Sequence, residues 1–358
     1  MSFSRNANVI VYALLIILGS AVICGCQPKK KDDSISTSTN RYLYIQSGGC
    51  FAPTGLTASN ASKTVSRINL TTGVLDKTVI DYTANLTDTP VAIADIDSDN
   101  MYILIENTGG RRIEVVNKTT GVTSSIYFMN TTALNAVVRT LTFGSDGSFL
   151  ISKSSAVERF TSSKARLPSS ATTFLSAPVA PCATSTNAIT ATAFMNNGNI
   201  LYAHSFSSAS TNNRIGITTG SAAAASTCVQ GTASPNTAAF PTAMVYLSSI
   251  NQLLVAYSSS TLAQNYIWQY GINESTGAIT PAASAAYSNP AVINGPTAMA
   301  YDSTTGIIYI ANGTTVMANS IEAFTYDSTA KTLTRIGTVP FSSPTVNHNC
   351  INSMFIGN

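Results

Sequence analysis

Six polar side chains end short apolar runs of this sequence, and a seventh precedes another such run. Together they could line a small pocket for a neutral or weakly anionic ligand, with Lys153 as its only fixed cation. Side chains at such positions also commonly cap turns and satisfy backbone groups. The candidate ligand-binding residues are Gln46, Asn107, Lys153, His204, Tyr257, Asn312 and His348.

Acid–base or nucleophilic catalysis has little support in these residues. His204 and His348 are the only two histidines, and no G-x-S-x-G motif accompanies either of them. A serine or cysteine nucleophile needs a nearby base and an orienting acid. Two histidines without regular spacing also make a poor metal site. We therefore name no catalytic residue.

Calcium is the one cofactor that the sequence leaves open, because calcium prefers hard oxygen ligands. Asp95, Asp97, Asp99 and Asn100 form the densest acidic cluster, and their spacing is similar to that of a calcium loop. The cluster lacks the glycine and the distal glutamate of such a loop. The residues from Asp97 to Asn100 also suit a hairpin turn, so we expect no cofactor here.

An internal repeat of about 50 residues must position these side chains. Each copy contains apolar runs that are separated by turn residues, as at Asn196-Asn-Gly198. Four antiparallel strands per copy predict the blades of an all-β propeller. The copies begin at Pro90, Val138, Ile189, Pro241, Pro296 and Cys350.

The two ends of the repeat array complement each other. The last copy, from Cys350, stops after one strand, while the first segment, Arg41 to Gln46, looks like a second strand without a first. We expect these two strands to pair and close the ring. Six starts then predict six blades, with seven as the alternative if a degenerate copy lies within the Ser/Ala stretches.

One aromatic stretch indicates how the blades pack. Tyr266, Trp268 and Tyr270 alternate along a third strand, so their side chains share one side. Exposed aromatic residues could bind glycans or peptides. We expect these three instead to pack between neighbouring blades.

The segment Tyr309-Ile-Ala-Asn312, preceded by Gly295 to Asp302 and by Gly306, resembles the YVTN-type repeat of lactonase-like β-propellers. Ile103 to Asn107 is a looser copy. The resemblance covers most of residues 41–358 as a repeat pattern, and it implies the fold. The family includes lactone hydrolases, surface proteins and binding scaffolds, so the resemblance does not choose among them. It also implies that a calcium site in the channel is possible.

The amino-terminal segment has the layout of a secretory signal peptide, with Arg5 followed by an apolar stretch. The junction Ile23-Cys24-Gly25-Cys26 resembles the bacterial lipobox. This resemblance predicts a signal peptide over residues 1–25, lipidation (palmitate) on Cys26 and membrane attachment through that lipid. Residues 26–40 are polar and predict a flexible tether. We expect residues 41–358 to form the propeller domain. Gln27 favours the outer membrane in a typical Gram-negative host, on either the periplasmic or the surface side.

The charge of the predicted domain argues against one class of partner, and its cysteines predict disulfides. Without Arg5 and the three lysines and two aspartates of residues 29–33, the 19 basic and 16 acidic residues fall to 15 and 14. A body so near neutrality does not suggest nucleic acid. Export leaves four cysteines in an oxidising setting. Ring closure predicts a disulfide between Cys50 and Cys350, and elimination leaves Cys182 to pair with Cys228.

The sequence thus predicts a lipid-anchored, monomeric propeller that binds a protein or a small polar ligand in the cell envelope without catalysis. Two alternatives stay open. The first is a lactonase-like hydrolase with a metal in the central channel, for which Asp95, Asp302 and Asn352 are the only obvious inner-strand ligands. The second is a structural subunit of an envelope complex.

Overall fold

The computed structural model describes a chain of strands with one 3-10 turn, η2 (Leu262–Gln264). It divides the chain at residue 39, and every described residue belongs to the second unit, Asn40–Asn358. None of the described helical segments is long and apolar enough to cross a membrane. The described residues are 40–48, 63–85, 87–107, 110–129, 138–144, 146–153, 156–161, 166–167, 188–205, 214–218, 227–230, 239–259, 261–313, 320–339 and 351–358.

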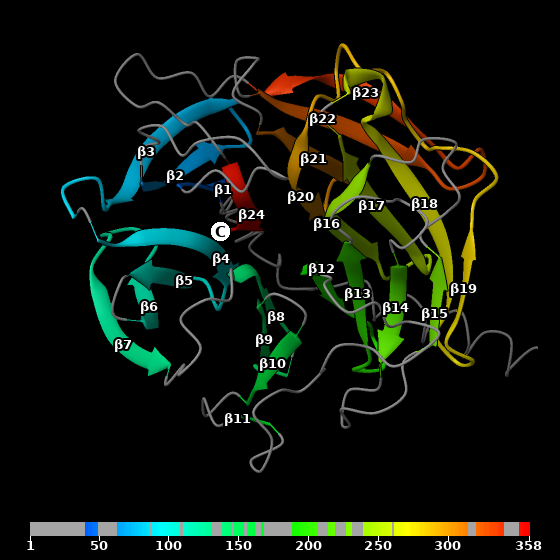
Figure 1. Ribbon diagram of the computed structural model, residues 1–358. Helices are drawn as coiled ribbons and strands as arrows, with labels where there is room; N and C mark the ends of the chain where they lie inside the picture. The colour runs from blue at the N-terminus through cyan, green and yellow to red at the C-terminus, as the bar shows by residue number, and fades with distance from the viewer. Residues whose placement is uncertain are drawn as a thin grey trace, which may run out of the picture. The chain divides into compact units, whose positions relative to one another are not determined.

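Six antiparallel sheets of four strands each form the blades of a propeller (Figure 1). The innermost strands are β4 (Thr89–Asp95), β8 (Val138–Phe143), β12 (Ala188–Phe194), β16 (Phe240–Leu247), β20 (Pro296–Asp302) and β24 (Ile351–Gly357). The second strands are β1 (Tyr42–Ser47), β5 (Asn100–Asn107), β9 (Phe149–Lys153), β13 (Ile200–Ser205), β17 (Gln252–Ser258) and β21 (Ile307–Asn312). The third strands are β2 (Thr64–Asn69), β6 (Gly110–Asn117), β10 (Ala156–Phe160), β14 (Arg214–Thr218), β18 (Tyr266–Asn273) and β22 (Ser320–Asp327). The outermost strands are β3 (Val74–Asp81), β7 (Thr123–Met129), β11 (Arg166–Leu167), β15 (Thr227–Gln230), β19 (Ala278–Pro281) and β23 (Thr332–Val339).

The ring closes as the sequence predicts. The first sheet has the order β24-β1-β2-β3, so the last strand of the chain is the innermost strand of the first blade. Tyr42 pairs with Gly357 and Gln46 pairs with Ser353. The innermost strands contact one another in the order β4, β8, β12, β16, β20, β24 and back to β4. This arrangement confirms six blades rather than seven.

A repeated turn joins the third and outermost strands of three blades. The side-chain oxygen of Asn117 accepts hydrogen bonds from the backbone N–H groups of Thr119 and Thr120, at 3.0 and 2.8 Å. Asn69 and Asn273 make the same two contacts in their own turns. Gly121 ends the turn with a φ of 72°, a conformation that glycine adopts without steric cost. The turn residues of the sequence therefore act through a side-chain cap and a left-handed glycine.

The aromatic residues of β18 pack between two blades, as predicted. Tyr266, Trp268 and Tyr270 are all buried, in one cluster with Leu201 and Ile215 of the neighbouring blade. The rings of Tyr257 and Tyr266 stack with their centroids 4.9 Å apart. Such offset aromatic pairs add to the stability that burial provides.

Every innermost strand carries an irregularity near its start, where one residue is skipped in the pairing with the second strand. The skipped residues are Val91, Arg139, Thr190, Thr242, Thr297 and Asn352. At three of them a threonine hydroxyl donates to a carbonyl at the start of the next innermost strand. Thr190 donates to Pro241 O at 2.6 Å, and Thr242 donates to Pro296 O at 2.6 Å. Thr297 donates to Ile351 O at 2.5 Å. These β-bulges connect adjacent blades at the amino ends of the innermost strands.

Candidate functional site

The sequence-predicted polar residues do not share one level of the ring. Four of them each pair with the residue just before the bulge of their own innermost strand. These four are Lys153, His204, Tyr257 and Asn312. In the other two blades that partner is Ser47 or Ile105, so Gln46 and Asn107 lie at different levels. The end of an apolar run marks where burial changes along a strand, and it does not fix the strand register.

Several of these side chains are buried in internal contacts. Gln46 is fully buried, and its Nε2 donates to Pro90 O at 2.7 Å. The hydroxyls of Tyr257 and Tyr270 lie 2.6 Å apart and share a hydrogen bond. Asn312 accepts from the backbone N–H of Asn294 at 2.9 Å. His204 is also fully buried. The ligand-binding role of these residues stays a prediction.

Two members of the predicted set have no described side chain. His348 is outside the described residues, and only the backbone of Lys153 is described. The same limit applies to the cysteines, because Cys228 alone lies in a described strand, β15. The two disulfides and the lipidated Cys26 therefore also stay predictions.

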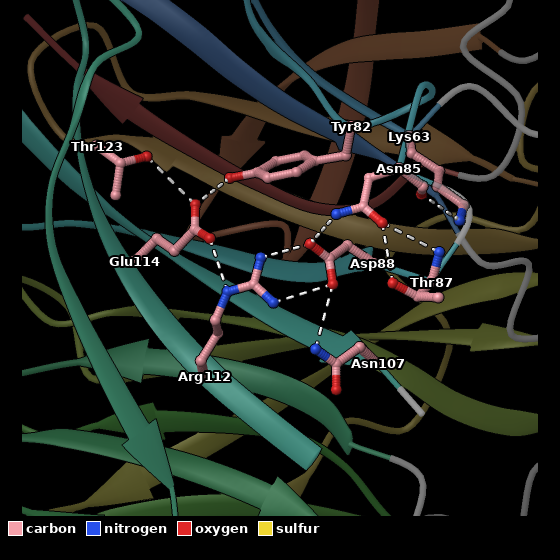
Figure 2. A network of polar contacts seen from close by, with 9 residues as sticks. All are labelled: Lys63, Tyr82, Asn85, Thr87, Asp88, Asn107, Arg112, Glu114 and Thr123. Atoms are coloured by element: carbon pink, nitrogen blue, oxygen red, sulfur yellow. Dashed lines mark hydrogen bonds and ion pairs between the residues drawn. The ribbon is translucent and has the colours of Figure 1, made fainter. Parts of the chain in front are cut away.

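Asn107 belongs to a polar network that joins the first blade to the next one (Figure 2). Its Nδ2 donates to Asp88 at 3.2 Å. The guanidinium of Arg112 donates to both oxygens of Asp88, at 2.9 and 2.5 Å, and to Glu114 at 2.8 Å. The hydroxyl of Tyr82, which follows β3, donates to Glu114 at 2.7 Å. Asp88 and Glu114 are each only 4% exposed.

The charges of this network stabilise one another. The hydrogen bond from Arg112 is the main reason that the pKa of Asp88 lies below its ordinary value. Burial, followed by the hydrogen bond to Glu114, raises the pKa of Tyr82, which keeps the phenol protonated. The arginine is thus held between two buried carboxylates in a closed arrangement, which suits a structural role. Sequence reasoning missed this network, although Arg112 and Glu114 alternate on one side of β6.

The described residues enclose an axial cavity of about 650 Å³, which the innermost strands of all six blades line. At one end the lining stops at the level of the bulges, for example at Thr190 and Asn352. At the other end it extends beyond the last residues of β4 and β8, to Ile96 and Gly144. Gln46, Asn107, His204, Tyr257 and Asn312, the five sequence-predicted residues with described side chains, do not line this cavity. The cavity therefore runs along the axis from the bulges towards the carboxyl ends of β4 and β8.

Among the described residues that line the cavity, Asp95 alone is charged. Its Oδ1 lies 2.5 Å from Nζ of Lys118, whose side chain is 1% exposed and which also donates to Asp97 O at 2.5 Å. Burial is the largest influence on the pKa of Asp95 and raises it, while Lys118 acts in the opposite direction. The carboxylate at the cavity wall is therefore already paired with a buried cation.

The acidic cluster around Asp95 does not fit a calcium ion. The ammonium group of Lys118 occupies the position that a cation would take beside Asp95. Asp97 caps its own hairpin turn, since its Oδ1 accepts from the N–H groups of Asp99 and Asn100, both at 2.8 Å. Within the described ranges, no three His, Cys, Asp or Glu residues are grouped so that they could hold a metal ion.

Comparison with solved structures identifies lactonase-like β-propellers as neighbours of this fold. No family model and no curated protein matches the sequence. A protein of unknown function from Bacteroides caccae is 12% identical with a TM-score of 0.56, over 89% of this chain and 99% of that one. The periplasmic gluconolactonase PpgL of Pseudomonas aeruginosa is 10% identical with a TM-score of 0.53, over 90% and 86%. A candidate 6-phosphogluconolactonase of Bacteroides fragilis is 14% identical with a TM-score of 0.52, over 87% and 85%. At these identities the likeness extends to the fold alone.

Proposed function

We propose that this chain is an exported, lipid-anchored propeller that binds a small uncharged ligand in its axial cavity without transforming it. The observation that carries the proposal is the cavity itself, whose volume of about 650 Å³ lies within the range of small-molecule sites. The cavity is lined by side chains on rigid strands that contact one another around a closed ring. A site on such a frame is formed before the ligand arrives, which lowers the cost of binding.

The charge of the lining supports an uncharged ligand. Asp95 carries the single charge on the described lining, and Lys118 already compensates it. A charged ligand would lose its hydration in this cavity without gaining an unpaired counter-charge. An uncharged ligand bears no such cost.

The proposal is tested by measuring the binding of neutral small molecules to the purified chain by calorimetry. We expect saturable binding of one molecule per chain. Thr142 lines the cavity and is half-buried, so Thr142→Trp should fill the cavity and abolish binding. Thr334 is exposed on β23, so Thr334→Trp is the matched control and should bind normally. Equal binding by both variants would place the ligand elsewhere.

A lactonase-like hydrolase is the second candidate, and the fold neighbours named as gluconolactonases favour it. Of the three inner-strand residues that this reading needs, Asp95 and Asn352 line the cavity. Asp302 does not line it, because its carboxylate pairs with Arg41 and accepts from the N–H groups of Thr304 and Thr305. Hydrolysis of gluconolactone above the spontaneous rate would show that the chain is a hydrolase rather than a binding protein, provided that the activity is lost in Asp95→Asn and Asn352→Ala.

Lipid attachment is the part of the proposal that rests on the amino-terminal sequence. Cys26 would carry the lipid, and residues 26–40 would span the distance from the membrane to β1. Labelling of growing cells with radioactive palmitate tests it directly. Label in the wild-type chain but not in Cys26→Ser supports the anchor, and an unlabelled wild-type chain contradicts it.

A further inference from the structure

The axial cavity has two unlike walls. Met244, Met299 and Met354 line it from three consecutive innermost strands, β16, β20 and β24. Each of them follows the bulge of its strand by two residues, so the three stand at the same level. They are 7–8% exposed, and we call them the methionine wall. Methionine side chains are flexible and polarisable, so they adapt to apolar ligands of varied shape.

The wall across the axis carries hydroxyl groups. β8 and β12 lie opposite β20 and β24 in the order of the ring, and they supply Thr140, Thr142 and Thr192 to the lining. The Oγ1 atom of Thr192 lies 3.2 Å from that of Thr140 and 2.7 Å from that of Thr142. We call these three residues the threonine ladder.

The protons of the threonine ladder are committed to internal hydrogen bonds. Thr140 donates to Oγ of Ser152 at 3.0 Å, and Thr142 donates to the backbone oxygen of Thr192 at 3.1 Å. The hydroxyl of Thr192 is left to donate to one of the other two. A hydroxyl has one proton but two acceptor lone pairs, so the ladder offers the cavity acceptors rather than donors. A complementary ligand therefore brings its own O–H or N–H group.

Aromatic residues line the cavity towards the carboxyl ends of four innermost strands, and we call this part its aromatic end. Phe143, Phe194, Tyr246 and Phe355 all line it at or near the carboxyl ends of their innermost strands, and all four are half-buried. Their rings add apolar surface to the lining at this end. The apolar methionine wall and the aromatic end thus face the same space as the polar ladder.

We propose that the cavity selects an amphipathic neutral molecule, with its apolar part on the methionine wall and a hydroxyl or N–H donor on the threonine ladder. This inference rests on the proposed function and specifies its ligand class. A fully hydroxylated ligand would place polar groups against thioethers and leave them without partners. A pure hydrocarbon would leave the acceptors of the ladder unused.

Three probes of graded polarity test the ligand class: 2-naphthol, 2-methoxynaphthalene and glucose. They are titrated into residues 26–358, the predicted mature chain, carrying Cys26→Ser, so that neither the apolar leader nor a lipid calls for detergent that would compete for the cavity. We expect 2-naphthol to bind at one site per chain, about tenfold more tightly than 2-methoxynaphthalene, which lacks a donor, since one good hydrogen bond is worth roughly that ratio. Glucose should not bind. Glucose binding in place of 2-naphthol would overturn this inference and leave the proposed function standing. If none of the neutral molecules tested binds, then both this inference and the proposed function are wrong.

Variants of each wall test the orientation. Thr192→Val keeps the shape but removes the hydroxyl, so the preference for 2-naphthol over 2-methoxynaphthalene should fall towards one. Met299→Gln should weaken 2-naphthol binding about tenfold, while Met299→Leu should stay within about twofold, because it keeps the wall apolar. Melting curves confirm that each variant is folded. An unchanged preference in folded Thr192→Val would contradict the proposed orientation.

Discussion

The guanidinium of Arg112 binds the carboxylate of Asp88 through two hydrogen bonds, of 2.9 and 2.5 Å, and both side chains are almost entirely inside the protein. Asp88 immediately precedes β4, and Arg112 lies in β6. Through Glu114 the same arginine connects to Tyr82 at the end of the first blade. The pair therefore holds the start of β4 against β6 of the same blade, and the hydrogen bond from Tyr82 to Glu114 joins that blade to the one that closes the ring.

Replacing Arg112 by methionine should lower the free energy of unfolding by about 3 kcal/mol, because it leaves two buried carboxylates without their cation. Urea denaturation measures the change. Arg335→Met is the matched control. Arg335 is 41% exposed, and its partner Glu322 keeps hydrogen bonds from Thr338, so the loss should stay below about 1 kcal/mol. Similar losses of unfolding free energy in both variants would contradict a structural role for the network.

Asp88 should make stability depend on pH in a defined direction. Its pKa is lowered, mainly by the hydrogen bond from Arg112, so its contribution to stability is complete above its unfolded pKa of about 4. That contribution is lost as the pH falls through the folded pKa. The difference in unfolding free energy between wild type and Asp88→Asn should therefore be largest at pH 7 and shrink below about pH 4. A difference that is equal at pH 7 and pH 3 would refute this assignment.

Most of the fold could be predicted from the repeat, because its period and its incomplete ends are visible in the sequence. Pro296 and the alternating Tyr266, Trp268 and Tyr270 show where strands start and which faces are buried. The site was less predictable. Met244 follows an apolar pattern that fits any core, and only its register beyond a bulge places it on the axis. Bulges such as the one at Thr242 depend on pairing between strands, which a linear pattern does not record.

A disulfide between Cys50 and Cys350 should join the two ends of the ring. Both cysteines lie outside the described residues, but Ile351, next to Cys350, pairs with Ser47 in β1. A covalent link at this place would restrict the unfolded chain and stabilise the fold by about 3 kcal/mol. Peptide mapping without reduction should recover the two cysteines in one fragment. Recovery of both as free thiols from oxidised protein would contradict the pairing.

Deletion of residues 351–358 should prevent the domain from folding as a monomer. The deletion removes β24, which exposes the edge of β1 and the buried side chains of Ile351 and Met354. It also removes the contacts between Ser353 and Ile93 that join the closing blade to β4. An unpaired strand edge of this kind promotes association between chains. We expect aggregates or oligomers in size-exclusion chromatography, together with the loss of a cooperative melting transition.

A permuted chain separates the loss of pairing from the loss of eight residues. In this variant residues 351–358 are moved to the amino-terminal side of Arg41 and joined to it by a short glycine-rich linker. β24 and β1 are antiparallel neighbours, and Gly357 pairs with Tyr42, so a tight turn can connect them. The permuted chain should be monomeric and melt cooperatively, because every strand pair of the closing blade is restored. If it aggregates like the deletion, then the identity of the strand beside β1 does not decide closure, and the ring depends on contacts elsewhere.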